Sequence, residues 1–255
     1  MHKRLILAAI IALAAPQVAL SAEEALPLCP GASEILAADP LLRSAVRAAY
    51  PETRERRGRT RRSLNQPCIY PYRAIPYDDA VVLITLAQVP GTACHGCAAD
   101  VSAVFLKRDG STLTPVSRHD SFVQIGTFGD LASIEPFRLG AQHGLMVEGG
   151  GTFQGYSSSV MVPFLIQDGQ MLAVGPDGGI PGGDSNCGAV VDDELPCREV
   201  EGRWRVDGDR LIVHYTGTRG DGSPVDGTVV YELRDGSLVL VSGAEVAAEM
   251  IENRP

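Results

Sequence analysis

The sequence lacks the compact motifs that identify many catalytic or cofactor-binding proteins. It contains no Gly-x-Ser-x-Gly nucleophile elbow and no Ser-x-x-Lys pair. Its single Cys-x-x-Cys is not followed by histidine, which excludes covalent haem attachment, and no second pair completes a zinc site. No repeat of fixed period indicates a propeller or a solenoid. We therefore predict no cofactor, no metal site and no catalytic constellation.

Long apolar runs are missing after the first 22 residues. No later stretch reaches the roughly 18 unbroken apolar residues of a membrane span. The beginning, MHKRLILAAIIALAAPQVALSA, has a charged start at Lys3 and Arg4, an apolar run over 5–15, and small residues near Ala22. This arrangement is typical of a secretory signal peptide. We predict that residues 1–22 are removed and that the mature protein is periplasmic or secreted, with no membrane span.

Basic residues are few relative to acidic ones. Without Lys3 and Arg4, 20 basic residues remain against 31 acidic ones, a net charge of −11. This excess argues against general nucleic-acid binding. Six arginines nevertheless gather within nine residues, where they form either a solvated loop or a contact with an anionic surface such as lipid headgroups. They are Arg54, Arg56, Arg57, Arg59, Arg61 and Arg62.

Cysteine is present in an even number, and all six cysteines follow the predicted cleavage site. In an oxidising compartment such a set indicates disulfide bonds before metal ligands. Six cysteines allow fifteen pairings, and the sequence alone does not choose among them. Pairing of nearest neighbours is the simplest prediction. It gives Cys29–Cys68, Cys94–Cys97 and Cys187–Cys197.

A helical lead-in with an arginine-rich loop is predicted over residues 23–64. Within ASEILAADPLLRSAVRAAYPE, Asp39 suits a helix cap, Pro40 suits the first turn, and Pro51 ends the helix. From residue 65 the pattern changes to short runs of β-branched and apolar residues separated by turn residues. The chain is therefore predicted to be helical only at its start and, briefly, at its end.

Asp-Gly pairs organise the β region. The dipeptide occurs seven times, and four copies, beginning at Asp109, Asp168, Asp207 and Asp235, directly join two strand-like runs. Asp-Gly tolerates the positive φ angles of a tight hairpin. We predict a mainly β fold: an antiparallel sandwich, barrel or pair of sheets built from hairpins, with a short helical N-terminal segment.

The β region is predicted to fall into three parts. Residues 65–175 form a main β domain, and residues 200–255 form a C-terminal meander with a short helix. Between them, residues 176–199 are rich in Gly and Asp, lack an apolar period, and are predicted to be a loop closed by Cys187–Cys197. The C-terminal part is either separate or one domain with residues 65–175.

The stretch GTACHGCAAD raises a redox hypothesis. A Cys-x-x-Cys at a helix N-terminus has a reactive first thiol, whereas His95 with the two cysteines would need a fourth ligand to hold zinc. Residues 162–175, VPFLIQDGQMLAVG, resemble the proline-then-hairpin segment that lies beside the dithiol in the thioredoxin superfamily. The resemblance implies a periplasmic thiol-disulfide oxidoreductase using Cys94, Cys97 and Pro163. It requires a helix over residues 98–107; a strand there leaves the pair as a small disulfide ring.

A second stretch, EGGGTFQGY, predicts a binding surface. It holds too many glycines for a plain strand, so either a bulge or close backbone approach to a ligand explains it. The leading prediction is an exported, non-catalytic β-rich binding or envelope protein of unknown ligand, because β scaffolds bind through loops and sheet faces. The oxidoreductase is the alternative. The predicted binding residues are Gly149, Gly150, Gly151, Phe153, Gln154 and Tyr156.

Overall fold

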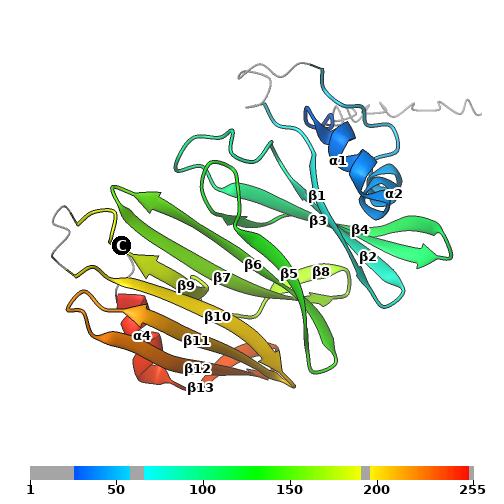
Figure 1. Cartoon of the computed structure of the whole chain (residues 1–255). Helices are drawn as coiled ribbons and strands as arrows, with labels where there is room; N and C mark the ends of the chain where they lie inside the picture. The colour runs from blue at the N-terminus through cyan, green and yellow to red at the C-terminus, as the bar shows by residue number, and fades with distance from the viewer. Residues whose placement is uncertain (1–25, 58–65, 191–195, 253–255) are drawn as a thin grey trace, which may run out of the picture.

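A computed structural model, drawn in Figure 1, describes residues 26–57, 66–190 and 196–252. The predicted signal peptide and Arg59, Arg61 and Arg62 lie outside these ranges. Across the described residues, no helix has the length and apolar character needed to cross a bilayer.

Asp-Gly turns join neighbouring strands at all four predicted positions. Gly110, Gly169, Gly208 and Gly236 have φ angles of 57°, 68°, 63° and 81°, values that L side chains rarely adopt. The predicted hairpins are therefore confirmed. They connect β3 (Ala99–Asp109) to β4 (Thr112–Ile125), β7 (Tyr156–Gln167) to β8 (Gln170–Ala173), β10 (Glu199–Asp207) to β11 (Arg210–Thr218), and β12 (Pro224–Arg234) to β13 (Ser237–Ser242).

Two antiparallel sheets result, as the sequence predicts. The first has four strands in the order β1 (Tyr70–Tyr77), β2 (Ala80–Leu86), β3, β4. The second sheet has nine strands, in the order β13-β12-β11-β10-β9-β7-β6-β5 with β8 beside β7. The bounds not yet given are those of β5 (Ser133–Leu139), β6 (Gln142–Phe153) and β9 (Ile180–Ser185). The chain changes sheet between β4 and β5, within residues 65–175.

Helices cover the two sheets on separate sides (Figure 1). α1 (Ala32–Ala38) and α2 (Pro40–Ala49) lie on the first sheet. α4 (Ala244–Glu252) packs against β12 of the second sheet. The side chain of Asp39 caps α2 as predicted, because its Oδ1 accepts a hydrogen bond of 2.9 Å from the Leu42 amide. The N-terminal helical segment is thus confirmed as two short helices that meet at Asp39.

Three hydrophobic cores lie between these layers. The first is under α1 and α2, the second is between the two sheets, and the third is enclosed by the second sheet and α4. Strand β6 contributes to two of them, because Leu145 and Val147 belong to the core between the sheets and Met146 to the third core. Beyond Val147, β6 continues as the glycine-rich stretch.

The segment predicted as a Gly/Asp-rich loop contains a strand. β9 pairs with β7 on one side and β10 on the other, so it lies inside the second sheet. Glycine makes this possible: a Cβ on Gly183 would lie 2.6 Å from the Val200 carbonyl oxygen. Strands built from glycine have no apolar alternation, so the sequence pattern predicted a loop here.

All three predicted disulfides are present: Cys29–Cys68, Cys94–Cys97 and Cys187–Cys197. The residues after Cys97 settle the question raised by the dithiol. Residues 99–109 form β3, which pairs with β2 and β4, and not a helix. The alternation of buried and partly buried side chains at the start of β3 and its buried run over residues 103–106 explain the preference for strand.

Candidate functional site

A groove of about 1120 Å³ crosses the second sheet where β6, β7, β9 and β10 lie side by side. Its floor is formed by residues of these four strands. The segment of residues 127–132, between β4 and β5, forms the opposite wall. Gly150 and Gly151 of the predicted glycine-rich stretch therefore line a groove.

The floor consists of two rows of residues that pair across the strands. One row is Gly150, Ser159, Gly183 and Glu201, and the other is Thr152, Ser157, Ser185 and Glu199. Because side chains alternate along a strand, the two rows face the same side of the sheet. That side presents hydroxyl groups and carboxylates, and two positions have no side chain at all. Such a surface can donate hydrogen bonds to a polar ligand and accept them from it.

Glu148 brings a partly buried carboxylate to the same place. The Ser133 hydroxyl donates to Glu148 Oε2 at 3.4 Å. Burial raises the pKa of the Glu148 carboxyl, and the nearby charge of Glu201 raises it further, while the Ser133 hydrogen bond only partly offsets this. A Cβ on Gly182 would lie 2.4 Å from Ser159 Oγ and 3.2 Å from Glu148 Oε1, so glycine keeps open the space between hydroxyl and carboxylate.

Replacing Glu148 with glutamine should raise the unfolding midpoint temperature at pH 7 and leave it unchanged at pH 4. The pKa of Glu148 is raised in the folded protein, so its favourable contribution is present below its unfolded pKa, about 4.3, and is lost as pH rises through the folded value. Glutamine removes the charge that is costly at pH 7. Thermal unfolding followed by circular dichroism measures the difference, and an equal gain at both pH values would contradict the assignment.

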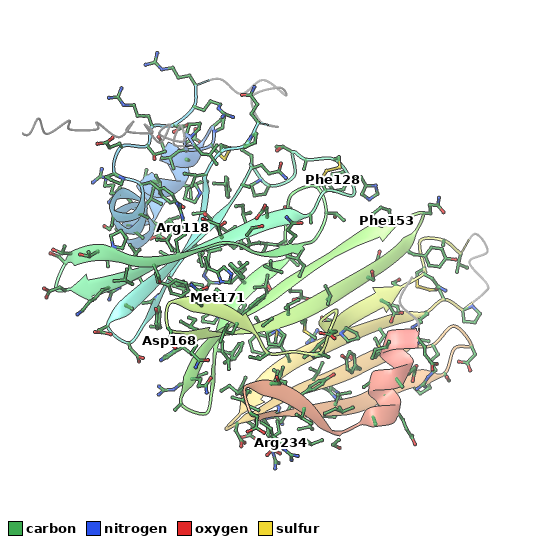
Figure 2. All side chains as sticks on the ribbon, turned by 180° about the vertical axis from the view of Figure 1, so that it is seen from behind. Arg118, Phe128, Phe153, Asp168, Met171 and Arg234 are labelled. Carbon is green, nitrogen blue, oxygen red and sulfur yellow. A yellow bond between two sulfur atoms is a disulfide. The ribbon has the colours of Figure 1, made fainter. Side chains whose placement is uncertain are left out.

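Three aromatic rings form a stack at the rim of the groove. The His95 ring lies between Phe128, at 4.7 Å and 10° between planes, and Phe153, at 4.4 Å and 7°. His95 Nε2 donates to the Thr152 carbonyl oxygen at 2.8 Å, since a carbonyl can only accept. Figure 2 labels both phenylalanines, which lie at the same end of the molecule. We call Phe128, His95 and Phe153 the aromatic stack.

The Cys94–Cys97 loop holds this stack in place. Backbone amides of Phe128 and Gly129 donate to the carbonyl oxygens of His95 and Cys97, at 3.2 and 2.7 Å. The Ala93 amide donates to the Phe128 carbonyl oxygen at 3.1 Å. The short disulfide loop and the segment that carries Phe128 are therefore bound together on both sides of His95.

Phe128 occupies an unfavourable backbone conformation. Its φ angle is 56°, in the left-handed region that costs a bulky L residue about 1–2 kcal/mol. The ring is nevertheless 43% exposed, so burial of the side chain does not account for a phenylalanine at this position. Strain that surrounding hydrogen bonds maintain is found preferentially at functional sites.

An ion cluster supports the floor from behind. Asp184 and Arg198 are 9% and 7% exposed, and Arg198 contacts both carboxylate oxygens of Asp184, through Nη2 at 3.1 Å and through Nε. Arg198 Nη1 also donates to Glu249 of α4 at 3.1 Å, and Arg219 binds Glu249 twice at 2.8 Å. These contacts tie β9 to α4.

No family model matches the sequence, and no curated protein sequence matches it. Among solved structures, two mutants of the levansucrase of B. megaterium are similar at a TM-score of 0.33, with 10% and 9% identity over 69% of this chain and 48% of theirs. An α-L-arabinanase of Penicillium chrysogenum, complexed with arabinobiose, gives a TM-score of 0.30 and 15% identity over 64% and 46%. The chain spans about half the length of these enzymes. A structural likeness this weak is not evidence of a shared activity.

The predicted binding residues divide between groove, stack and turn. Gly150 and Gly151 line the groove, and Phe153 belongs to the aromatic stack. Gly149 has a packing role, since a Cβ there would lie 2.6 Å from Ile125 Cγ1. Gln154 forms the hairpin turn with a φ of 52°, and the exposed Tyr156 pairs with Phe153 across it.

The residues of the oxidoreductase hypothesis do not come together. Pro163 pairs with Met146, whereas the loop of Cys94 and Cys97 contacts β6 at Thr152, which pairs with Ser157. Six residues separate Ser157 from Pro163 along β7, a span of about 20 Å. The pair lacks both the following helix and the neighbouring proline that the resemblance requires. Between the two cysteines, His95 lies in the aromatic stack.

Other predicted contacts are only partly described. The Arg56 guanidinium donates to the carbonyl oxygens of Gln66 and Pro67 at 3.2 and 2.9 Å, which engages it within the chain. Arg54 and Arg57 lie in the same described segment, and the remaining three arginines lie outside it. Within residues 26–57, 66–190 and 196–252, no group of three or more His, Cys, Asp or Glu residues is arranged to hold a metal ion.

Sequence patterns missed most of the site. Phe128, Ser159 and Glu201 carry no local motif, because their importance arises from pairing across strands far apart in the chain. For His95 the sequence raises only haem attachment and zinc coordination, and neither predicts the ring stack. The clue for Phe128 was its position in TFGD, where a bulky residue stands in a turn sequence.

Proposed function

We propose that the protein is an exported binding protein, periplasmic or secreted after cleavage near Ala22, and that its ligand-binding site is the groove over β6, β7, β9 and β10. The observation that carries the proposal is the floor, where two rows of residues bring hydroxyls and carboxylates to a groove and two positions, Gly150 and Gly183, have no side chain. Ligand sites are typically concave and carry a few convergent polar groups. Three disulfides are compatible with export, since such bonds persist in oxidising compartments.

Filling the groove tests the proposal. Glu201→Trp places a large ring on the floor, and Asp207→Trp makes the same change of charge and size on the same strand, outside the groove lining. Ligand-observed NMR on the mature chain would use three sets of probes: neutral hexasaccharides, spermidine, and trilysine. We expect at least one set to bind wild type and Asp207→Trp, and to lose its saturation-transfer signal with Glu201→Trp. The proposal is wrong if no set shows this dependence.

A further inference from the structure

We propose that the groove binds a neutral oligosaccharide and that the outer face of Phe128, the member of the aromatic stack that lines the groove, is the platform on which one sugar ring packs. The inference rests on the proposed function and adds the class of ligand.

The aromatic stack has the exposure and rigidity of a platform. Phe128 lines the groove and is 43% exposed, and Phe153 is 52% exposed. Each ring uses one face against His95, so the opposite faces are directed away from the stack. One face of a pyranose ring is formed largely by C–H groups, which pack on an aromatic face as other apolar groups do. Because the hydrogen bonds of the Cys94–Cys97 loop already hold the rings, little conformational entropy is lost on binding.

The floor has the groups that saccharide hydroxyls need. Ser157, Ser159 and Ser185 can each donate and accept, and Glu148 and Glu199 accept. Ser157, Ser185 and Glu148 each have one partner within the protein, but each retains further capacity for hydrogen bonds. A purely apolar ligand would exclude water from that capacity without replacing it, at a cost of about 1–3 kcal/mol for each group left unsatisfied. The floor thus matches a ligand that is polar along its edges and apolar on its ring faces.

The charge of the groove lining and the volume of the groove narrow the class of ligand further. Apart from Asp184, which is paired with Arg198, four acidic residues line the groove: Asp130, Glu148, Glu199 and Glu201. The one arginine in the lining, Arg203, is bound to Glu201 at 3.2 Å. Anionic saccharides and nucleotides would therefore be repelled. A volume of about 1120 Å³ exceeds the roughly 300–1,000 Å³ of sites for drug-sized ligands, so several linked sugar rings fit better than a monosaccharide.

Affinity measurements with variants of the stack test this inference. Maltohexaose, xylohexaose, cellohexaose and chitohexaose would be titrated calorimetrically into the mature chain, with spermidine and trilysine as cationic probes. Phe153→Ala and Phe128→Gly each remove one ring, and Phe128→Gly also relieves the positive φ at that position. Leu172→Ala is the matched control, since Leu172 is similarly exposed but lies on β8, outside the lining. Thermal unfolding checks that each variant is folded.

We expect at least one hexasaccharide to bind, with affinity reduced about threefold to tenfold by Phe128→Gly and unchanged by Leu172→Ala. Phe153→Ala removes the far end of the stack and should reduce affinity less than Phe128→Gly does. Saccharide binding that Phe128→Gly leaves intact would overturn the platform. Binding of spermidine or trilysine alone, lost with Glu201→Trp, would overturn the ligand class and leave the proposed binding function standing. If no probe binds in a way that depends on the groove, both proposals fail.

Discussion

Replacing Asp184 with alanine is expected to lower the free energy of unfolding by about 3–5 kcal/mol. Asp184 is buried and its carboxylate is held by two nitrogens of Arg198, which is itself only 7% exposed. The substitution leaves the guanidinium buried without its main counter-ion. Glu249 remains as one partner at 3.1 Å, so the loss should fall within this range and not above it. Urea denaturation of the mature chain measures the change.

An exposed ion pair on the neighbouring strand provides the control. Arg205 and Asp207 lie on β10 with 3.7 Å between Nη1 and Oδ2, and the Asp207 side chain is 72% exposed. Asp207→Ala should cost about 0–1 kcal/mol, because water screens the pair. If Asp184→Ala costs no more than this control, the cluster does not anchor β9 to α4 as described.

Removing the Cys29–Cys68 disulfide by the double change to alanine is expected to cost about 4 kcal/mol. The two cysteines are fully buried and 39 positions apart, so the bond restricts the largest loop in the unfolded chain. It joins the segment before α1 to the segment before β1, beside the hydrogen bond from the Cys29 amide to the Ile69 carbonyl oxygen at 2.9 Å. Denaturant unfolding under non-reducing conditions gives the value.

The other two disulfides close shorter loops, so removing either should lower the free energy of unfolding by less. Their separations are 10 positions for Cys187–Cys197 and 3 for Cys94–Cys97, which on the same loop-entropy argument gives about 3 and 2 kcal/mol. The expected order of loss is therefore Cys29–Cys68, then Cys187–Cys197, then Cys94–Cys97. A loss for Cys94–Cys97 equal to that for Cys29–Cys68 would mean that contacts of the folded protein, and not loop closure, dominate.

Local chemistry was enough to predict most of the fold. A hairpin depends strongly on the residues of its turn, and the glycine of each Asp-Gly pair lies in a two-residue turn with a positive φ. This is why the four pairs located four connections correctly: Gly110, Gly169, Gly208 and Gly236. The cap at Asp39 and the helix over residues 244–252 are local in the same sense. β9 escaped prediction because its stability comes from neighbours on both sides, while its own residues, IPGGDS, have low strand propensity.

The site was predicted only where it coincides with an unusual local composition. The glycines of residues 149–151 pointed to the correct stretch of β6, since close packing and an open groove both exclude side chains. The carboxylates that face them come from β10, about fifty residues later, and the wall comes from the segment before β5. Sequence alone does not give this register, because a bulge in the β7–β9 pairing and the residues between β9 and β10 lie between those strands.

Because β6 is buried on both faces, it determines how the protein unfolds. Leu145 and Val147 complete the core against the first sheet, and Met146 completes the core that reaches α4. Neither the first sheet nor the part of the second sheet that packs on α4 can unfold without exposing side chains of β6. We therefore expect one cooperative transition for the whole chain, with no folded fragment obtainable by cutting at residue 175. The groove floor, as the continuation of β6, should stay closed to hydrogen exchange until that single transition occurs.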